Sequence, residues 1–161
     1  MNSGHMLLTL AAVFLLSNLI LNSHKANTSR MLTNYTSESV IDASGLAQSI
    51  IDMIQSKAFD EMTVNKPVWQ TDSLTTVNNL GPETGEYQHT DFDDIDDYNN
   101  SNTTVSLDRM GDFDINVSVF YVGTLNPNIK SSIPTYSKKI ELSIINYSLL
   151  DTLKFHHIIT Y

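Results

Sequence analysis

The stretch MLLTLAAVFLLSNLIL, from Met6 to Leu21, carries no charged side chain, and its only polar residues are Thr9, Ser17 and Asn18. An α-helix of this composition satisfies its backbone hydrogen bonds internally and can present an apolar surface to lipid. At 1.5 Å per residue it covers roughly 24 Å, a little less than the ~30 Å hydrocarbon core of a bilayer. The stretch therefore predicts a membrane-spanning helix, in which Asn18 is best placed facing another helix.

The residues before this stretch bear on whether it is an anchor or a cleaved signal. We predict a short leader or N-terminal tail at residues 1–5 and a transmembrane or assembly helix at residues 6–22. A secretory signal peptide is the alternative, but it needs a positively charged leader and a small-residue cleavage site. MNSGH carries no lysine or arginine, and no A-x-A pattern follows the apolar run. The pattern favours an anchor.

The helical signal continues without a proline as far as SIIDMIQSKAFDE, from Ser49 to Glu61. Apolar residues recur at a helical period in one stripe made of Val40, Ala43, Ala47, Ile50 and Ile54. We therefore predict an amphipathic continuation of the helix over residues 23–59. The stripe either packs on the chain's own domain or also contacts a helix of another subunit, which makes it a candidate helix assembly face.

Charge and composition exclude several classes of function. The net charge is −9, and residues 59–128 hold thirteen of the eighteen acidic side chains against two basic ones. A region this acidic repels the phosphates of nucleic acid, so we expect no nucleic-acid partner. The chain has no cysteine, which excludes disulfides and thiol chemistry. Its length leaves room for one modest domain beside the membrane segment.

The middle of the chain, residues 60–102, is predicted to be an acidic loop region. Turn-forming residues interrupt it at Pro67, Gly81, Pro82 and Gly85. Thr, Asn and Asp dominate the rest, so an apolar core would cover little of its backbone. Trp69 is predicted to be an anchor that pins the loop to the helix or sheet, rather than a platform for a ligand.

From residue 103 to residue 161 the apolar period changes to two, which indicates strands with one buried face. The alternating residues are Phe113, Ile115, Val117, Val119 and Tyr121, then Ile140, Leu142 and Ile144, then Leu153, Phe155, His157, Ile159 and Tyr161. With a shorter strand near Thr104, the simplest assembly is an antiparallel meander of about four strands. The predicted fold class is α+β, with the amphipathic half of the long helix covering the apolar face of the sheet.

The acidic loop offers candidate ligands for calcium, which takes six to eight hard oxygen atoms. The candidates are Asp91, Asp93, Asp94, Asp96 and Asp97, with Asn99 beside them. Their register is not that of an EF-hand, because Ile95 stands where a ligand is needed and no glycine makes the turn. A solvated acidic loop, or one that docks on Lys138 and Lys139 of a neighbouring subunit, is the alternative.

Signals of catalysis are weak. His156 and His157 alternate along a predicted strand, so they point to opposite faces, and neither H-E-x-x-H nor G-x-S-x-G occurs. We expect no enzymatic activity and no small-molecule substrate. Six N-x-S/T sequons begin at Asn27, Asn34, Asn99, Asn102, Asn116 and Asn146. They indicate either glycosylation of an extracellular protein or chance in a chain rich in Asn, Ser and Thr.

This layout resembles that of a type IV pilin or type II secretion pseudopilin. LAQSIIDMIQSKAFDE (Leu46 to Glu61) is similar to the end of the long helix in minor pilins and pseudopilins. FDDIDDYNN (Phe92 to Asn100) is similar to the acidic loop that leads into their sheet. The resemblance implies a structural subunit that assembles with copies of itself or with other pilin-like subunits. It also implies a single pass through the inner (cytoplasmic) membrane, with the C-terminal domain periplasmic or extracellular.

The N-terminus departs from the pattern of that family. Gly4 followed by His5 is a candidate processing site, but the leader has no basic residue, and the fifth position after Gly4 is Thr9 in place of the glutamate that the family has there. This favours a minor or atypical subunit. Lys25 and Arg30 follow the apolar stretch, so the positive-inside rule alone would place the C-terminal domain in the cytoplasm. The alternative function is a single-pass membrane-anchored accessory protein whose β-domain binds a partner without forming filaments.

Overall fold

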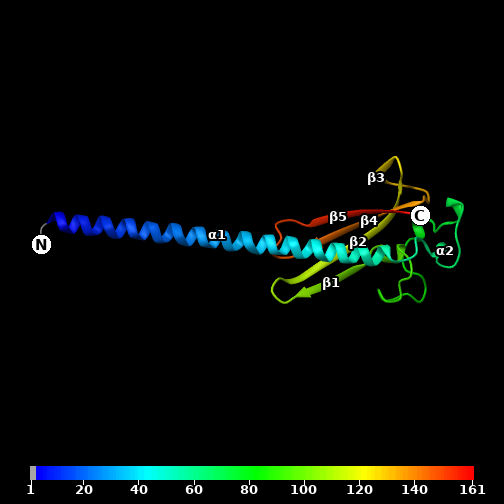
Figure 1. The fold of residues 1–161 in the computed structure, drawn as a ribbon, viewed down its shortest axis with the longest axis horizontal. Coiled ribbons are helices and arrows are strands. Elements are labelled where there is room, and N and C mark those ends of the chain that lie inside the picture. The colour runs from blue at the N-terminus through cyan, green and yellow to red at the C-terminus, as the bar shows by residue number, and fades with distance from the viewer. Residues whose placement is uncertain (1–2) are drawn as a thin grey trace. The chain divides into compact units, whose positions relative to one another are not determined.

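The structure is a computed structural model that describes residues 3–161. The chain divides into two compact units, one ending at Glu38 and the other spanning Ser39–Tyr161. Helix α1 spans Ser3–Gln55 (Figure 1). Residues 3–5 of the predicted leader are therefore helical, and residues 1–2 lie outside the described part of the chain. The long helix and the antiparallel sheet confirm the predicted α+β class.

Helix α1 ends four residues earlier than the predicted boundary at Phe59. Its last turn tightens, because the backbone N–H of Lys57 donates to Ile54 O at 3.1 Å. Ala58 then leaves the helix and pairs with the loop: its N–H donates to Asp93 O at 3.1 Å, and its carbonyl accepts from Ile95 N–H at 2.9 Å. The end of the long apolar pattern is thus bonded to the acidic loop rather than wound into the helix.

The sheet has five antiparallel strands rather than about four. They are β1 (Asn102–Leu107), β2 (Gly111–Gly123), β3 (Asn126–Lys130), β4 (Ser137–Ile145) and β5 (Leu153–Thr160). The order is β1-β2-β4-β5, and the additional strand β3 pairs with the end of β2. The predicted alternation is present. In β2, Phe113 and Ile115 are buried and Asp114 between these two is exposed, and in β4 Ile140 is buried.

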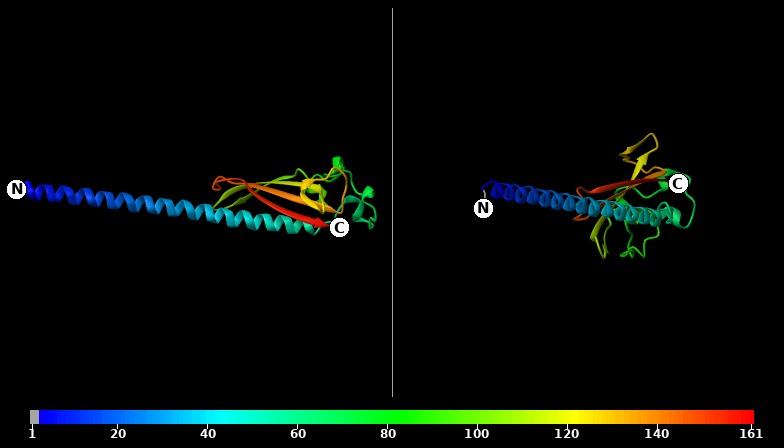
Figure 2. Two further views of the ribbon diagram at one scale, coloured as in Figure 1. Left: turned by 90° about the horizontal axis from the view of Figure 1, so that it is seen from above. Right: turned by 60° about the vertical axis from the view of Figure 1, so that its left-hand side comes forward.

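The part of α1 that belongs to the second unit covers one face of the sheet (Figure 2, left). Its buried residues are Ser39, Ala43, Ala47, Ile51 and Ile54. Three of these five side chains are small, so the helix can approach the sheet closely. Ser39 Oγ lies 3.5 Å from Met110 Sδ at the β1–β2 turn. The apolar stripe is therefore the inner face of this domain.

Three of the five residues of the predicted stripe lie on the buried face of the helix. Ala43, Ala47 and Ile54 are buried and Ile50 is half-buried, but Val40 is 39% exposed. Ser39 and Ile51 take the buried positions instead. Because these residues pack on the chain's own sheet, intramolecular packing accounts for the apolar stripe without a second subunit.

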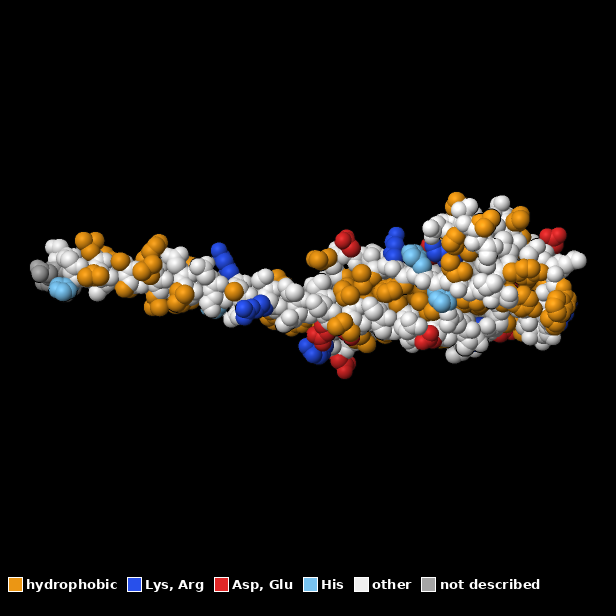
Figure 3. Space-filling model, turned by 45° about the horizontal axis from the view of Figure 1, so that its top comes forward, with side chains coloured by type: hydrophobic (Ala, Val, Ile, Leu, Met, Phe, Trp, Pro, Cys, Tyr) orange, Lys and Arg blue, Asp and Glu red, His pale blue; other side chains and the backbone are white. Residues whose placement is uncertain are grey.

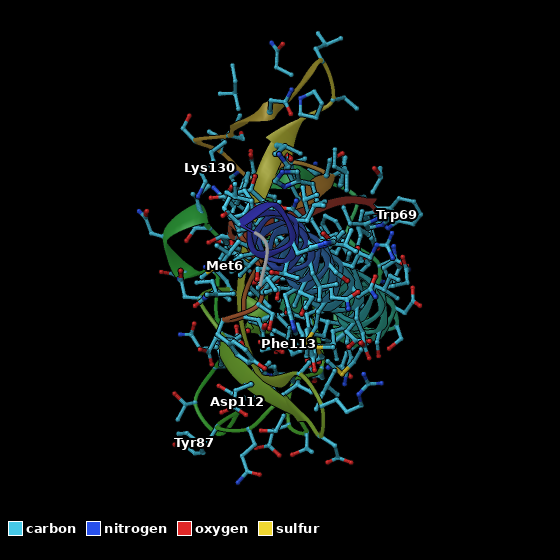
Figure 4. The ribbon with its side chains drawn as sticks, turned by 90° about the vertical axis from the view of Figure 1, so that its left-hand side faces the viewer. Met6, Trp69, Tyr87, Asp112, Phe113 and Lys130 are labelled. Carbon is cyan, nitrogen blue, oxygen red and sulfur yellow. The ribbon has the colours of Figure 1, made fainter. Side chains whose placement is uncertain are left out.

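The loop region between α1 and the sheet is better packed than its composition indicates. It contains the short helix α2 (Glu61–Val64) and the 3₁₀ turns η1 (Thr71–Ser73), η2 (Val77–Asn79) and η3 (Asp96–Tyr98). Leu74, Phe92, Ile95 and Tyr98 are buried in the core. Trp69 is 85% exposed and points away from the ribbon, so the prediction that it anchors the loop is wrong (Figure 4).

Candidate functional site

The apolar stretch from Met6 to Leu21 is exposed along its whole length within the first unit. Hydrophobic side chains cover it, and no Lys, Arg, Asp or Glu lies among them (Figure 3). It belongs to the one helix of the described chain that is long and apolar enough to cross a membrane, by length and composition. A signal sequence near an N-terminus passes the same test, so the finding supports a membrane anchor or a signal.

Polar side chains inside this stretch bond to their own helix. Thr9 Oγ1 donates to Met6 O at 2.9 Å, Ser17 Oγ to Val13 O at 2.8 Å, and Asn18 Nδ2 to Phe14 O at 3.0 Å. Such bonds to the preceding turn satisfy donors that lipid could not. Asn18 therefore does not require another helix as its partner, although its amide oxygen remains able to accept a bond.

The predicted processing residues Gly4 and His5 lie in the first turns of α1. A Cβ atom added to Gly4 would meet nothing within 4 Å. The fold of the described chain therefore does not need glycine at this position. A role for Gly4 and His5 in processing stays a prediction.

A buried ion cluster joins the segment between α1 and α2, the acidic loop and the sheet. Lys138 of β4 is fully buried, and its Nζ lies 2.9 Å from Asp60 Oδ2 and contacts Asp96 Oδ1. The same Nζ donates to Phe59 O at 2.7 Å. The prediction that the loop docks on this lysine of a neighbouring subunit is therefore wrong, because Lys138 is buried and pairs with carboxylates of its own chain.

Asp60 is the best-bonded carboxylate of this cluster. Tyr121 Oη donates to Asp60 Oδ2 at 2.6 Å, and Thr75 N–H donates to Asp60 Oδ1 at 3.0 Å. Burial alone would raise the pKa of Asp60, but Lys138 and these donors outweigh it and hold the pKa below its usual value. For Asp96, burial prevails over Lys138 and raises the pKa. The cluster fastens the segment that follows α1 to the sheet.

The five aspartates predicted as calcium ligands do not converge. Asp91 and Asp93 are exposed, and Asp96 is engaged by Lys138. Asp94 Oδ1 accepts the backbone N–H groups of Asp96 at 2.7 Å and Asp97 at 3.2 Å. These two bonds tie Asp94 to the backbone of the η3 turn. The tight turn uses these carboxylates for its own backbone, and the one group of three such side chains found in residues 3–161 includes only Asp97 of the five. Calcium binding by the five together stays a prediction.

Asp97 instead faces two glutamates that the sequence reasoning missed. One oxygen each of Glu83, Glu86 and Asp97 lies within 4.8 Å of the others, the one such group found in residues 3–161. The two glutamates follow Gly81, more than ten positions before Asp97 in the sequence. They belong to the same acidic segment, but no periodicity links positions so far apart in a loop.

The remaining predicted residues have local partners on the sheet. Lys139 Nζ lies 3.0 Å from Glu141 Oε1, and His156 Nδ1 lies 3.4 Å from the same oxygen. His157 is half-buried and bonds to Gln55 of α1. The two histidines therefore lie on opposite faces, as predicted.

We compared the sequence with protein-family models, with curated proteins and with solved structures, and nothing matches it significantly. The likeness to pilins therefore rests on architecture. A long N-terminal helix whose last turns cover an antiparallel sheet is loosely consistent with a pilin-like fold.

Proposed function

We propose that this chain is a structural, non-catalytic subunit of a pilin-like filament or secretion pseudopilus, and that it assembles through the N-terminal part of α1. Its partners would be copies of itself or other pilin-like subunits. The observation that carries the proposal is the fully exposed apolar surface from Met6 to Leu21. A surface of this kind is stable in lipid or against other apolar helices, and not in water.

The second unit supports this assignment because its own core is complete. Residues of α1, the loop and four strands form one hydrophobic cluster, so this domain needs no further helix to cover its sheet. In a filament the N-terminal segments would form the shared apolar interior, while the β-domain would form the outer surface. This requires a single pass through the cytoplasmic membrane with the domain on the periplasmic or extracellular side.

Thr9 favours a second candidate, a membrane-anchored accessory protein that forms no filament. Its hydroxyl is bonded within the helix. Unlike the glutamate that the pilin family has at this position, Thr9 carries no negative charge that could neutralise the terminal amine of a neighbouring subunit. Such a protein would keep its helix in lipid and present the β-domain to a partner.

Mass spectrometry of the protein isolated from its native membrane separates the two candidates. A mature chain that begins at His5, especially with a methylated amine, supports the filament subunit, and sheared surface fractions should then contain it. An intact N-terminus in a particle without filaments would refute that assignment. A Gly4→Val variant serves as the control, because the structure leaves space for the side chain and only processing should change.

A further inference from the structure

Three carboxylates from two separate segments of the loop region come together in the second unit. Glu83 and Glu86 lie in the turn after Gly81, and Asp97 lies in η3. One oxygen atom of each lies within 4.8 Å of the other two. We propose that Glu83, Glu86 and Asp97 bind a divalent cation with the chemistry of calcium.

The turn that carries the two glutamates is closed by its own bonds. Glu86 N–H donates to Glu83 O at 3.2 Å, and Glu83 N–H donates to Glu86 Oε2 at 3.0 Å. Gly85 has φ = +119°, a conformation that favours glycine. The backbone therefore holds both side chains in one place before any ligand binds.

Asp97 supplies an independent reason to expect a ligand. It is 1% exposed, and its Oδ2 accepts the N–H groups of Asp93 at 2.9 Å and Asp94 at 3.0 Å. These bonds fix the carboxylate, yet its Oδ1 and the Oε2 of Glu83 are buried without a hydrogen-bond partner. Buried polar atoms are almost always satisfied, and an unmet carboxylate oxygen is costly. A cation between them would satisfy both.

The local charge balance is strongly negative. Residues 83–97 contain seven acidic side chains and no lysine or arginine. The two lysines that reach this region have other partners: Lys138 binds Asp60 and Asp96, and Lys57 Nζ donates to Phe92 O at 2.5 Å. Three carboxylate oxygens within 4.8 Å of one another repel unless a positive charge lies between them.

The donor atoms and their spacing select the cation. All three ligands are hard oxygens, which suit calcium or magnesium rather than zinc or copper. Calcium–oxygen distances of about 2.3–2.6 Å allow two ligands to lie about 5 Å apart, whereas magnesium at about 2.1 Å requires them within about 4.2 Å. A spread of up to 4.8 Å suits calcium without movement of the chain. Backbone carbonyls and water would complete the coordination.

Such a cation would fasten one half of the loop to the other. Asn99, which follows η3, already links both to the sheet: its Nδ2 donates to Leu80 O at 3.0 Å, and its Oδ1 accepts from Val119 N–H at 3.0 Å. A cation bound by both Glu83 and Asp97 would add a second link between the two halves of the loop, beside the one that Asn99 makes. The predicted consequence is a more stable β-domain, because a ligand that binds only the folded state stabilises it.

The experiment uses the full chain in detergent micelles, stripped of metal with a chelator and then titrated with calcium chloride. Scanning calorimetry should show that Tm rises by about 5 °C at roughly 10 mM calcium, given a Kd of about 10⁻⁴ to 10⁻³ M. The matched control is Asp91→Asn, which removes an exposed carboxylate of the same segment and should keep the full rise. Glu83→Gln and Asp97→Asn should each lose at least three quarters of it.

Two outcomes would overturn the proposal. One is an unchanged Tm and no binding heat with calcium. The other is an equal rise in Glu83→Gln, which conserves shape and tests the site even if Asp97→Asn fails to fold. A larger rise with magnesium than with calcium would overturn the choice of cation.

Discussion

The two parts of α1 show how one helix can serve two environments. From Met6 to Leu21 apolar residues occupy every face of the helix, and all of them are exposed. From Ser39 to Gln55 the apolar residues occupy one stripe, and that stripe is buried against the sheet. A helix that is apolar all round needs lipid or other helices, whereas an amphipathic one is covered by its own domain. Intramolecular packing thus explains the second part and leaves the first to contacts outside the chain.

Removal of the buried lysine should have the largest effect on the second part. Lys138→Met leaves Asp60 and Asp96 buried without their cation, and the loss of one partner from a buried pair costs about 3–5 kcal/mol. Urea unfolding of the chain in micelles, followed by the strand signal in circular dichroism, measures this change. Lys154→Met, at an exposed position of β5, should change the free energy of unfolding by less than about 0.5 kcal/mol. Equal stability of the two variants would show that the ion cluster does not hold the domain together.

The inner stripe predicts a smaller loss in the same assay. Ile54 is fully buried and Ile41 is 70% exposed on the same helix. Ile54→Ala should cost about 2–4 kcal/mol, because it leaves a cavity in the core. The matched variant Ile41→Ala should cost less than about 0.5 kcal/mol. A comparable loss for Ile41→Ala would mean that α1 uses a different face.

A substitution in the first part of the helix should impair membrane insertion and leave the stability of the β-domain unchanged. Leu15→Arg places a charge in the exposed apolar stretch, which costs about 2.5–3.5 kcal/mol on membrane insertion. We expect the variant to be lost from the carbonate-washed membrane fraction, with urea unfolding of its β-domain unchanged. Leu15→Ala is the control and should remain in the membrane. Unfolding of the β-domain by Leu15→Arg would contradict the division of the helix into two parts.

The acidic loop should make the second part sensitive to pH when metal is absent. Burial, then the neighbouring carboxylates Asp96 and Asp97, raise the pKa of Asp94 from its ordinary value of 3.8 to about 9. The folded state then keeps a proton that the unfolded chain loses, so this contribution is complete below the unfolded pKa and is lost as pH rises toward 9. Tm in chelator should be several degrees higher at about pH 5.5 than at about pH 8.5. Asp94→Asn should flatten the slope, and a wild-type Tm that increases with pH would contradict the account.

The smallest effect is expected at Trp69, whose side chain contributes little to the core. Trp69→Ala should change the free energy of unfolding by less than about 0.5 kcal/mol. Val68 beside it is buried, so Val68→Ala provides the contrast and should cost about 1–2 kcal/mol. A larger loss of stability for Trp69→Ala than for Val68→Ala would support the predicted anchoring role of the tryptophan.

Periodicity explains what could be predicted from the sequence. The alternation of Phe113 to Tyr121 and of Ile140 to Ile144 predicted two central strands, because side chains in a strand follow a simple period. Lys138 has the same parity as Ile140 and Leu142, and in the structure it lies opposite Tyr121, although the sequence analysis assigned it to contact with a neighbouring subunit. The parity is the signal that could have revealed the ion cluster, because a lysine at an inward position requires a buried acid.

The conformation of the loop could not be predicted from the sequence in the same way. Its conformation depends on bonds between side chains and backbone, such as those of Asp94 and Asp97 with the turns around them. The pairing of Asp97 with Glu83 and Glu86 depends on how two irregular segments fold back on each other. Composition identified the acidic segment, but three-dimensional placement decided which of its carboxylates come together.

The most direct test of the central claim is disulfide cross-linking of the first part of α1 in native membranes. Because the chain has no cysteine, Leu15→Cys introduces a single thiol, and Thr152→Cys, in the exposed β4–β5 connection, is the control. Assembly through the helix predicts covalent dimers for Leu15→Cys after mild oxidation and monomers for Thr152→Cys. Monomers alone for Leu15→Cys, in cells where the protein is present at its native level, would contradict it.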